Sequence, residues 1–221
     1  MVEPHLENAI AATLERRLIV PSSRSTLVAI SGIDGSGKGY VSERLRRELD
    51  GRGLRIAVIN IDGWLNLPDT RFSRESPAEH FYRHAIRFDE MFDQVVLPLR
   101  DRRSVRVEAD FAEETASRYR RHLYEFMDID ILIVEGIYLL KRQFRSHYDL
   151  SFWIDCSFET ALERAVARAQ EGLSPDLTPA TYRTIYFPAQ AIHFARDEPR
   201  AAATAVINND PRLITTSSRR A

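Results

Sequence analysis

A glycine-rich stretch with a single lysine carries the clearest chemical signal in this sequence. It follows an apolar run at 27–31, precedes a helical pattern, and consists of Gly32, Ile33, Asp34, Gly35, Ser36, Gly37, Lys38 and Gly39. Its four glycines allow positive φ angles, so we expect the loop to turn successive backbone N–H groups towards one anion. The ammonium group of Lys38 and the positive end of the following helix would face the same anion. The stretch therefore predicts a phosphate-binding loop.

The spacing of these residues matches the Walker A motif, G-x-x-x-x-G-K-[ST], at every position except the last. In this motif the residue after the lysine carries a hydroxyl group that binds Mg²⁺, whereas this chain has Gly39 there. A strand, a glycine loop and a helix in this order favour a nucleotide site over a plain glycine-rich turn. We therefore predict a P-loop that binds ATP, with Lys38 on the phosphates.

Two acidic residues each stand directly after an apolar run. Asp62 follows LRIAVINI at 54–61, and Glu135 follows DILIV at 130–134. Such runs are typical of parallel strands that are covered on both faces, and the carboxyl ends of parallel strands meet at one edge of the sheet. We therefore expect both carboxylates to lie beside the phosphate-binding loop.

These two acids could supply parts that phosphoryl transfer requires, namely a divalent metal site and a group that orients the attacking oxygen. Asp62 could accept the proton of a substrate hydroxyl or bind the metal, and its alternative role is to cap a turn with Gly63. Glu135 is the expected second metal ligand, and its alternative role is an ion pair with a nearby arginine.

Two arginines add positive charge on the same side of the sequence pattern. Arg164 and Arg168 lie one turn apart on a helix predicted at 158–169. The pattern breaks after this helix, and a lid at about 164–180 would bring the guanidinium groups onto the phosphates. We predict catalytic roles for both arginines, and the alternative is a solvated helix face.

His80 and His84 are four residues apart on a predicted helix, a spacing that is compatible with metal binding. No glutamate follows His80, and no third ligand is evident. Packing beside Phe81 and Tyr82, or contact with a substrate, is therefore the favoured interpretation.

The composition bounds the class of protein. The chain has 221 residues, of which 44% are apolar, enough for a single domain over 1–221 with a substantial core. The 31 basic and 32 acidic residues give a net charge of −1, so bulk charge predicts no binding to nucleic acid or to a membrane surface. The single cysteine, Cys156, excludes an internal disulfide, and no stretch resembles a signal peptide or a membrane span. We expect a soluble cytoplasmic protein and leave open whether it forms a homo-oligomer.

Alternating strand and helix patterns predict the fold class. Strands are expected at 26–31, 54–61, 130–134, 150–154 and 203–207. Helices are expected at 5–18, from the end of the glycine loop to Gly51, and at 78–96, 112–127 and 158–169. A last helix is expected to begin at Thr178-Pro179 and to be interrupted near Pro188. Right-handed crossovers between parallel strands imply an α/β fold of the P-loop NTPase type, with helices on both faces of a parallel sheet and a small lid. Residues 1–25 would form a leading helix and residues 64–127 a substrate-side insertion.

With these residues in place, the chain resembles the phosphoribulokinase/uridine kinase family of P-loop kinases over most of residues 26–210. The resemblance rests on Asp62-Gly63-Trp64, on VEGIYLL around Glu135, on YDLSFWIDCSFETALERAVAR at 148–168 and on PAQAIHFARDEPRAAATAVINN at 188–209. It implies a five-stranded parallel core. It also implies an enzyme, a phosphotransferase that uses ATP and Mg²⁺ to transfer the γ-phosphoryl group to a hydroxyl of a small metabolite such as a nucleoside or a sugar.

The resemblance also implies roles for individual residues. Asp62 matches the base for the accepting hydroxyl, and Glu135 matches a residue that helps to hold Mg²⁺. The helix that carries Arg164 and Arg168 would lead into the lid over ATP. The adenine would lie near the loop after the last strand, around 208–212.

One departure from the family pattern concerns the metal. Gly39 supplies no hydroxyl, so Mg²⁺ would rely on Asp62, Glu135, water and the phosphates themselves. This departure motivates a second hypothesis, a catalytically inactive or regulatory protein that binds ATP without transferring phosphate. A third hypothesis, an NTP hydrolase that drives a partner, is less favoured because the sequence lacks a second nucleotide motif.

A second departure concerns the acceptor. Uridine–cytidine kinases resemble this chain but carry a tyrosine and a histidine in the region matching 107–118, where Ala109 and Glu114 stand here. The difference argues against a pyrimidine nucleoside and leaves sugars, sugar phosphates, pantothenate and other nucleosides open. We expect the pocket to be walled by Trp64, His84 and Phe111.

Overall fold

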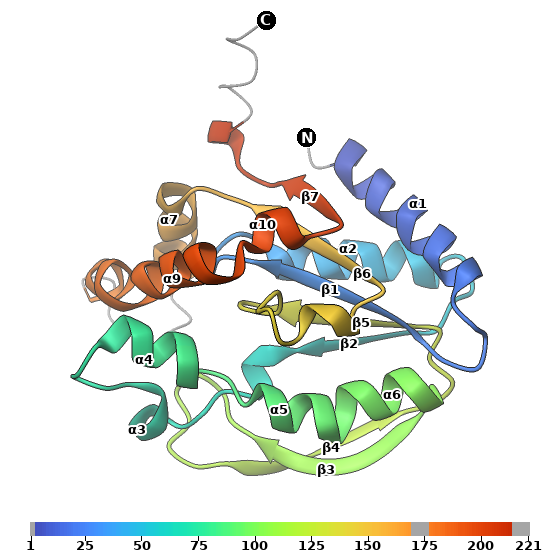
Figure 1. The fold of residues 1–221 in the computed structure, drawn as a ribbon, viewed down its shortest axis with the longest axis horizontal. Coiled ribbons are helices and arrows are strands. Elements are labelled where there is room, and N and C mark those ends of the chain that lie inside the picture. Colours follow the sequence, from blue (N-terminus) through green and yellow to red (C-terminus); the bar gives the residue numbers. More distant parts are fainter. Residues whose placement is uncertain (1–2, 169–176, 214–221) are drawn as a thin grey trace, which may run out of the picture.

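The structure, a computed structural model, describes residues 3–168 and 177–213. Its centre is a five-stranded parallel sheet with the strand order β2-β5-β1-β6-β7 (Figure 1). The strands of this sheet are β1 (Thr26–Gly32), β2 (Ile56–Asn60), β5 (Ile131–Gly136), β6 (Leu150–Asp155) and β7 (Ala205–Asn208). The sheet confirms the predicted α/β fold with a five-stranded parallel core.

Burial on both faces explains why these segments form parallel strands. All seven residues of β1 are buried. Leu27 and Ala29 belong to one apolar cluster, whereas Val28 and Ile30 belong to another on the opposite face. A strand that is covered on both faces requires a continuous apolar run, which is the pattern that predicted it.

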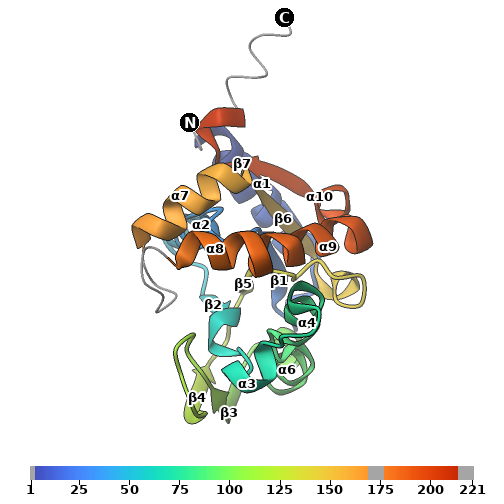
Figure 2. The same ribbon diagram turned by 90° about the vertical axis from the view of Figure 1, so that its left-hand side faces the viewer.

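Helices cover both faces of the sheet (Figures 1 and 2). One face is covered by α1 (Glu3–Ile19) and α2 (Lys38–Asp50). The other is covered by α4 (Pro77–His84), α5 (Phe88–Met91), α6 (Leu97–Arg102) and α9 (Phe187–Asp197). Shorter or peripheral helices are α3 (Pro68–Arg71), α7 (Phe158–Arg168), α8 (Thr178–Thr181) and α10 (Pro199–Ala202).

Residues 112–127, predicted as a helix, instead supply the second strand of an antiparallel hairpin. β3 (Val105–Phe111) pairs with β4 (Arg120–Phe126), and the hairpin is separate from the main sheet (Figure 2). The ring of Tyr124 stacks on Trp64 with centroids 5.4 Å apart, and the guanidinium of Arg120 lies 4.1 Å from the centroid of the Phe111 ring. The helix prediction is wrong because such long-range contacts override a weak local pattern.

The single helix predicted at 78–96 is divided in the structure. The chain leaves the helical path after α4, where Ile86 forms a β-bridge with Leu65, and then continues through α5 and a π-helical turn into α6. The π-helical turn immediately precedes the first turn of α6, which contains Pro98 and so lacks one backbone N–H. A second π-helical turn, Tyr182–Tyr186, forms the interruption predicted near Pro188.

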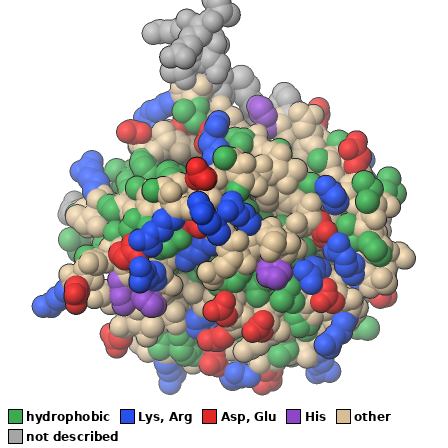
Figure 3. All heavy atoms as spheres, viewed as in Figure 1, with side chains coloured by type: hydrophobic (Ala, Val, Ile, Leu, Met, Phe, Trp, Pro, Cys, Tyr) green, Lys and Arg blue, Asp and Glu red, His purple; other side chains and the backbone are tan. Residues whose placement is uncertain are grey.

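The surface mixes charges of both signs. Figure 3 shows basic side chains interspersed with acidic and apolar ones over one face of the molecule. On α9 and α10, Arg196 pairs with Glu79 and Arg200 with Asp155. Each helix in the described part of the chain is too short or too polar to span a lipid bilayer.

Candidate active site

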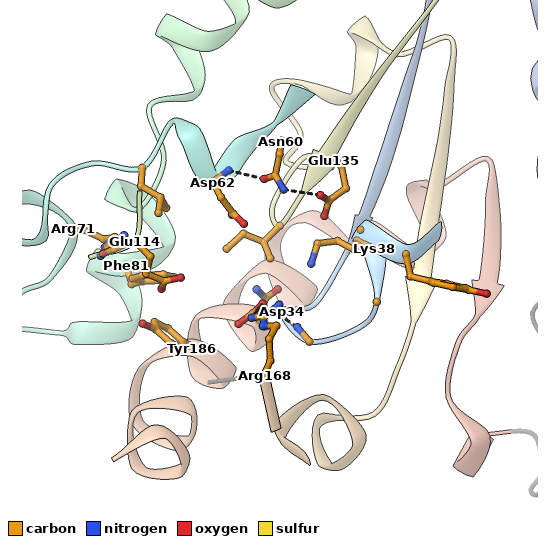
Figure 4. A pocket seen from close by; sticks show the side chains of 17 residues that line it. Asp34, Lys38, Asn60, Asp62, Arg71, Phe81, Glu114, Glu135, Arg168 and Tyr186 are labelled. Atoms are coloured by element: carbon orange, nitrogen blue, oxygen red, sulfur yellow. Dashed lines mark hydrogen bonds and ion pairs between the residues drawn. The ribbon is translucent and has the colours of Figure 1, made fainter. Parts of the chain in front are cut away.

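A cavity of about 320 Å³ opens at the carboxyl edge of the sheet, where β1, β2 and β5 end (Figure 4). It is lined by Asp34, Gly35, Gly37, Lys38, Gly39, Tyr40, Asn60, Asp62, Leu65, Arg71, Phe81, Glu114, Glu135, Ile137, Arg168, Tyr186 and Gln190. Figure 4 shows Lys38 on one side of Asp62 and the labelled side chains of Arg71, Phe81, Glu114 and Tyr186 on the other side. We call the part of the cavity that these labelled side chains line the far half.

The phosphate-binding loop joins β1 to α2 and depends on its glycines for two different reasons. Gly35 and Gly37 have φ angles of 72° and 91°, which only glycine adopts readily. A Cβ atom on Gly35 would also lie 2.5 Å from the carbonyl oxygen of Ala161. Gly32 and Gly39 do not have positive φ angles, contrary to our expectation; Gly32 is needed because its Cβ would lie 2.8 Å from the carbonyl oxygen of Ile154.

Lys38 begins α2 directly after the loop. Its side chain is buried, with 7% of the residue exposed, and its Nζ donates a hydrogen bond to the carbonyl oxygen of Ile33 at 3.0 Å. The ammonium group is thus held over the loop and lines the cavity, at the positive end of a helix of 13 residues. This combination suits an anion such as the phosphates of ATP.

Asp62 and Glu135 face the cavity from the ends of β2 and β5, and Asn60 connects them. The Asn60 side-chain amide donates to Oε2 of Glu135 at 2.9 Å, and its Oδ1 accepts from the backbone N–H of Asp62 at 2.7 Å. Glu135 is buried, whereas Asp62 is exposed to the cavity. The surrounding protein partly desolvates both carboxyl groups and so raises the pKa of each, to about 7 for Glu135, while Lys38 acts in the opposite direction.

The chemistry of these two acids suits a divalent cation such as Mg²⁺. Carboxylate oxygens are the ligands that this ion prefers, and a cation would offset the burial and the repulsion from Asp62 that raise the pKa of Glu135. A Cβ atom on Gly39 would lie 4.0 Å from Oε2 of Glu135, so the missing hydroxyl belongs beside this acid. Within 3–168 and 177–213 no cluster of three or more His, Cys, Asp or Glu side chains could hold a metal. A metal here would therefore take its other ligands from phosphates and water.

The structure separates the two predicted arginines. The guanidinium of Arg164 donates to the carbonyl oxygens of Ser36 at 3.1 Å and Asn209 at 2.8 Å, and Arg164 does not line the cavity. It therefore supports the loop from behind. Arg168 does line the cavity and lies 3.5 Å from the carboxylate of Asp34. Of the expected lid at 164–180, residues 169–176 lie outside the described residues.

The side chains expected to wall the pocket lie elsewhere. Trp64 is fully buried, and Phe111 packs against Gly63. His84 lies outside the cavity with its ring 4.5 Å from that of His80, whose Nε2 is hydrogen-bonded to the carbonyl oxygen of Thr70. The prediction of a wall made by Trp64, His84 and Phe111 is therefore wrong, because α3, α4 and α9 supply the wall instead.

Sequence reasoning missed several residues of the site. Asn60 stands two residues before Asp62 at the end of a strand, so this signal could have been found. Tyr182 donates a hydrogen bond to Asp34 in the loop. Arg71 and Gln190 come from helices that are far apart in the sequence, so no local pattern joins them.

Comparisons with known proteins find similar sequences and similar folds. A uridine kinase from Macrococcus caseolyticus is 28% identical over 149 residues, which cover 66% of this chain and 69% of that protein. A possible uridine kinase from Bacillus stearothermophilus has a similar fold, with a TM-score of 0.69 at 17% identity over 92% of this chain and 99% of that one. A protein from Silicibacter sp. TM1040, provisionally assigned as a fructose transport system kinase, has a TM-score of 0.72 at 24% identity over 91% and 98%.

The family comparison covers the site itself. The model of the phosphoribulokinase/uridine kinase family matches residues 27–172, a segment that includes the phosphate-binding loop, Asp62 and Glu135. This segment is more than half of the chain and extends from the first strand of the sheet beyond α7. The chain therefore belongs to the phosphoribulokinase/uridine kinase family.

Proposed function

We propose that this protein is an ATP-dependent kinase that transfers the γ-phosphoryl group to a hydroxyl of a small metabolite. The observation that carries the proposal is a single cavity that contains the phosphate-binding loop, Lys38 and the Asp62 carboxylate. Because the cavity continues beyond Asp62 into its far half, an acceptor hydroxyl has room beside a base and opposite a phosphate site (Figure 4). Membership of a kinase family supports the same activity.

In this proposal the donor side binds and neutralises the phosphates. The backbone N–H groups of the loop and the Lys38 ammonium group contact them, and Arg168 adds a second positive charge at the wall of the cavity. Arg164 acts on the carbonyl groups of the loop and keeps the loop in shape. Bound Mg²⁺, held by Glu135 together with phosphate and water ligands, would supply positive charge to the phosphates while Asp62 serves as the base.

On the acceptor side, Asp62 accepts the proton of the attacking hydroxyl. Its pKa is raised by desolvation, which makes it a better proton acceptor than an ordinary surface carboxylate. The hydrogen bond from its backbone N–H to Asn60 fixes the start of the turn that carries it. The reaction class is therefore phosphoryl transfer to an alcohol group.

The proposal is tested by a phosphate-transfer screen with nucleosides, sugars, sugar phosphates and pantothenate. The screen includes uridine and fructose because relatives carry these names. On the best acceptor, Asp62→Asn should lower the rate about 10²- to 10⁴-fold, since general-base catalysis contributes that much. The matched control is Asp93→Asn, an exposed acid outside the cavity. If Asp62→Asn transfers phosphate as fast as the wild type, the assigned base is wrong.

A second candidate function follows from Gly39. Without a hydroxyl beside Glu135, the protein could bind ATP as a regulatory or catalytically inactive member of the family. This alternative predicts that ATP stabilises the protein against heat while no acceptor in the screen receives phosphate. Transfer to any acceptor that depends on Asp62 decides for the kinase.

A further inference from the structure

The wall of the cavity contains two buried polar side chains with unused hydrogen-bonding atoms. Gln190 is 1% exposed, and both its Nε2 and its Oε1 lack a partner. Arg71 is 3% exposed, and its Nε lacks a partner. Both residues line the cavity. Because an unpaired buried polar group costs free energy, such groups in a cavity wall indicate the place of a ligand.

The remaining contacts of Arg71 hold its guanidinium group in one position. Its Nη2 donates to the carbonyl oxygen of Glu114 at 2.7 Å, and the group lies 4.8 Å from the centroid of the Phe72 ring. No ion pair joins it to a carboxylate within the described residues, although it is near enough to Asp62 to act on its charge. A buried guanidinium without a paired acid favours an anionic ligand.

Gln190 faces the same space from another element. It lies on α9, one helical turn after Tyr186, and Phe81 of α4 packs against Tyr186 with ring centroids 4.9 Å apart. An amide group offers both a donor and an acceptor, which is the complement of an alcohol group. The lining thus combines a fixed cation, an amide and an aromatic wall with one acidic residue, Glu114.

We propose that Arg71 and Gln190 form the acceptor-recognition subsite, and that the acceptor is a hydroxylated metabolite that carries an anionic group. Arg71 binds this group, a carboxylate or a phosphate, and Gln190 binds a hydroxyl that is not phosphorylated. The reacting hydroxyl is at the opposite end, next to Asp62. This inference rests on the proposed kinase function and adds the class of its substrate.

The first experiment measures binding, so that it does not depend on turnover. Thermal unfolding is followed with matched probes, namely glucose against glucose 6-phosphate and glycerol against glycerate. The phosphate and carboxylate arms distinguish the two sources of the anion, and stabilisation by either one supports the subsite. Arg71→Gln should abolish this stabilisation, whereas the exposed Arg74→Gln should retain it. If neutral and anionic probes act alike on the wild type, the subsite is overturned.

The second experiment measures phosphate transfer to the acceptor that binds. Arg71→Gln should lower kcat/KM about 10- to 100-fold more for the anionic acceptor than for its neutral counterpart, because one charged hydrogen-bonded contact is lost. Gln190→Met, of similar length but without the amide, should raise KM with little change in kcat. ATP should still stabilise both variants, which shows that they fold.

The two proposals fail differently in these experiments. Binding of anionic probes through Arg71 without any transfer would contradict the kinase and keep the subsite. Transfer that depends on Asp62 but is indifferent to Arg71→Gln and Gln190→Met would keep the kinase and overturn the subsite.

Discussion

Replacing Gly39 by serine restores the hydroxyl that the Walker A motif has after its lysine. The structure accommodates the change, because φ of Gly39 is not positive and the nearest atom to an added Cβ is Oε2 of Glu135 at 4.0 Å. The new Oγ would lie beside the proposed metal site. Serine is also favoured over glycine inside a helix by about 0.5 kcal/mol, so the fold should not lose stability.

The magnitude of the gain follows from the type of contact added. One contact from a hydroxyl to a charged group contributes about 1.5 to 3 kcal/mol, which corresponds to an affinity about 10- to 100-fold higher. We therefore expect Gly39→Ser to lower by that factor the Mg²⁺ concentration required for half-maximal binding of a fluorescent ATP analogue. The assay needs no acceptor, so it applies to the kinase and to the regulatory alternative.

The matched control for this experiment is Gly39→Ala. It adds the same Cβ and also favours the helix, but it carries no hydroxyl. If Gly39→Ala and Gly39→Ser require the same Mg²⁺ concentration, or if both match the wild type, the placement of the metal beside Glu135 and Gly39 is refuted. Transfer activity that appears only in Gly39→Ser would favour the regulatory alternative for the natural chain.

Two further predictions concern the phosphate-binding loop and Asp197, whose hydrogen bond with Tyr82 joins α9 to α4. Gly35→Ala should abolish stabilisation by ATP in a thermal-unfolding assay, because its Cβ would meet the backbone of Ala161. The control is Gly53→Ala, at a similar φ of 82° but in open space, which should lower the free energy of unfolding by only about 1 kcal/mol and keep ATP binding. Burial raises the pKa of Asp197, but hydrogen bonds with His193 and Tyr82 outweigh it and bring the pKa from 3.8 to about 2. Asp197→Asn should therefore lower the free energy of unfolding by about 2 kcal/mol at pH 7, as measured by urea unfolding. The difference between the variant and the wild type should shrink as the pH falls from 4 to 2, because the wild-type carboxylate is then protonated. A difference that is independent of pH would contradict this prediction.

The strands of the main sheet could be predicted because their buried apolar residues are consecutive in the sequence. β1, β5 and β6 are covered on both faces, which demands unbroken apolar runs. The meeting of the loop, Asp62 and Glu135 in one cavity also follows from sequence, since parallel strands place their carboxyl ends at one edge. These inferences need only local pattern and the handedness of the crossovers.

The hairpin and the far half could not be predicted in this way. β4 is stabilised by contacts such as that of Tyr124 with Trp64, which lie far apart along the chain. From their spacing of four residues on one helix, we predicted that Arg164 and Arg168 act together. A separation of four residues nevertheless adds about 40° of rotation and about 6 Å of rise, and here one arginine reaches the back of the loop while the other reaches the cavity.

A single helical segment connects the two halves of the proposed site. Tyr182, Tyr186 and Gln190 follow one another at four-residue spacing, so they share one side of the segment from α8 to α9. Tyr182 donates a hydrogen bond to Asp34 of the phosphate-binding loop, whereas Tyr186 and Gln190 line the cavity. In the proposed complex, the length of this segment would set the distance between the phosphates and the part of the acceptor that Gln190 binds. A kinase built in this way would select its acceptor by the distance between the hydroxyl that Gln190 binds and the reacting hydroxyl, as well as by the charge that Arg71 recognises.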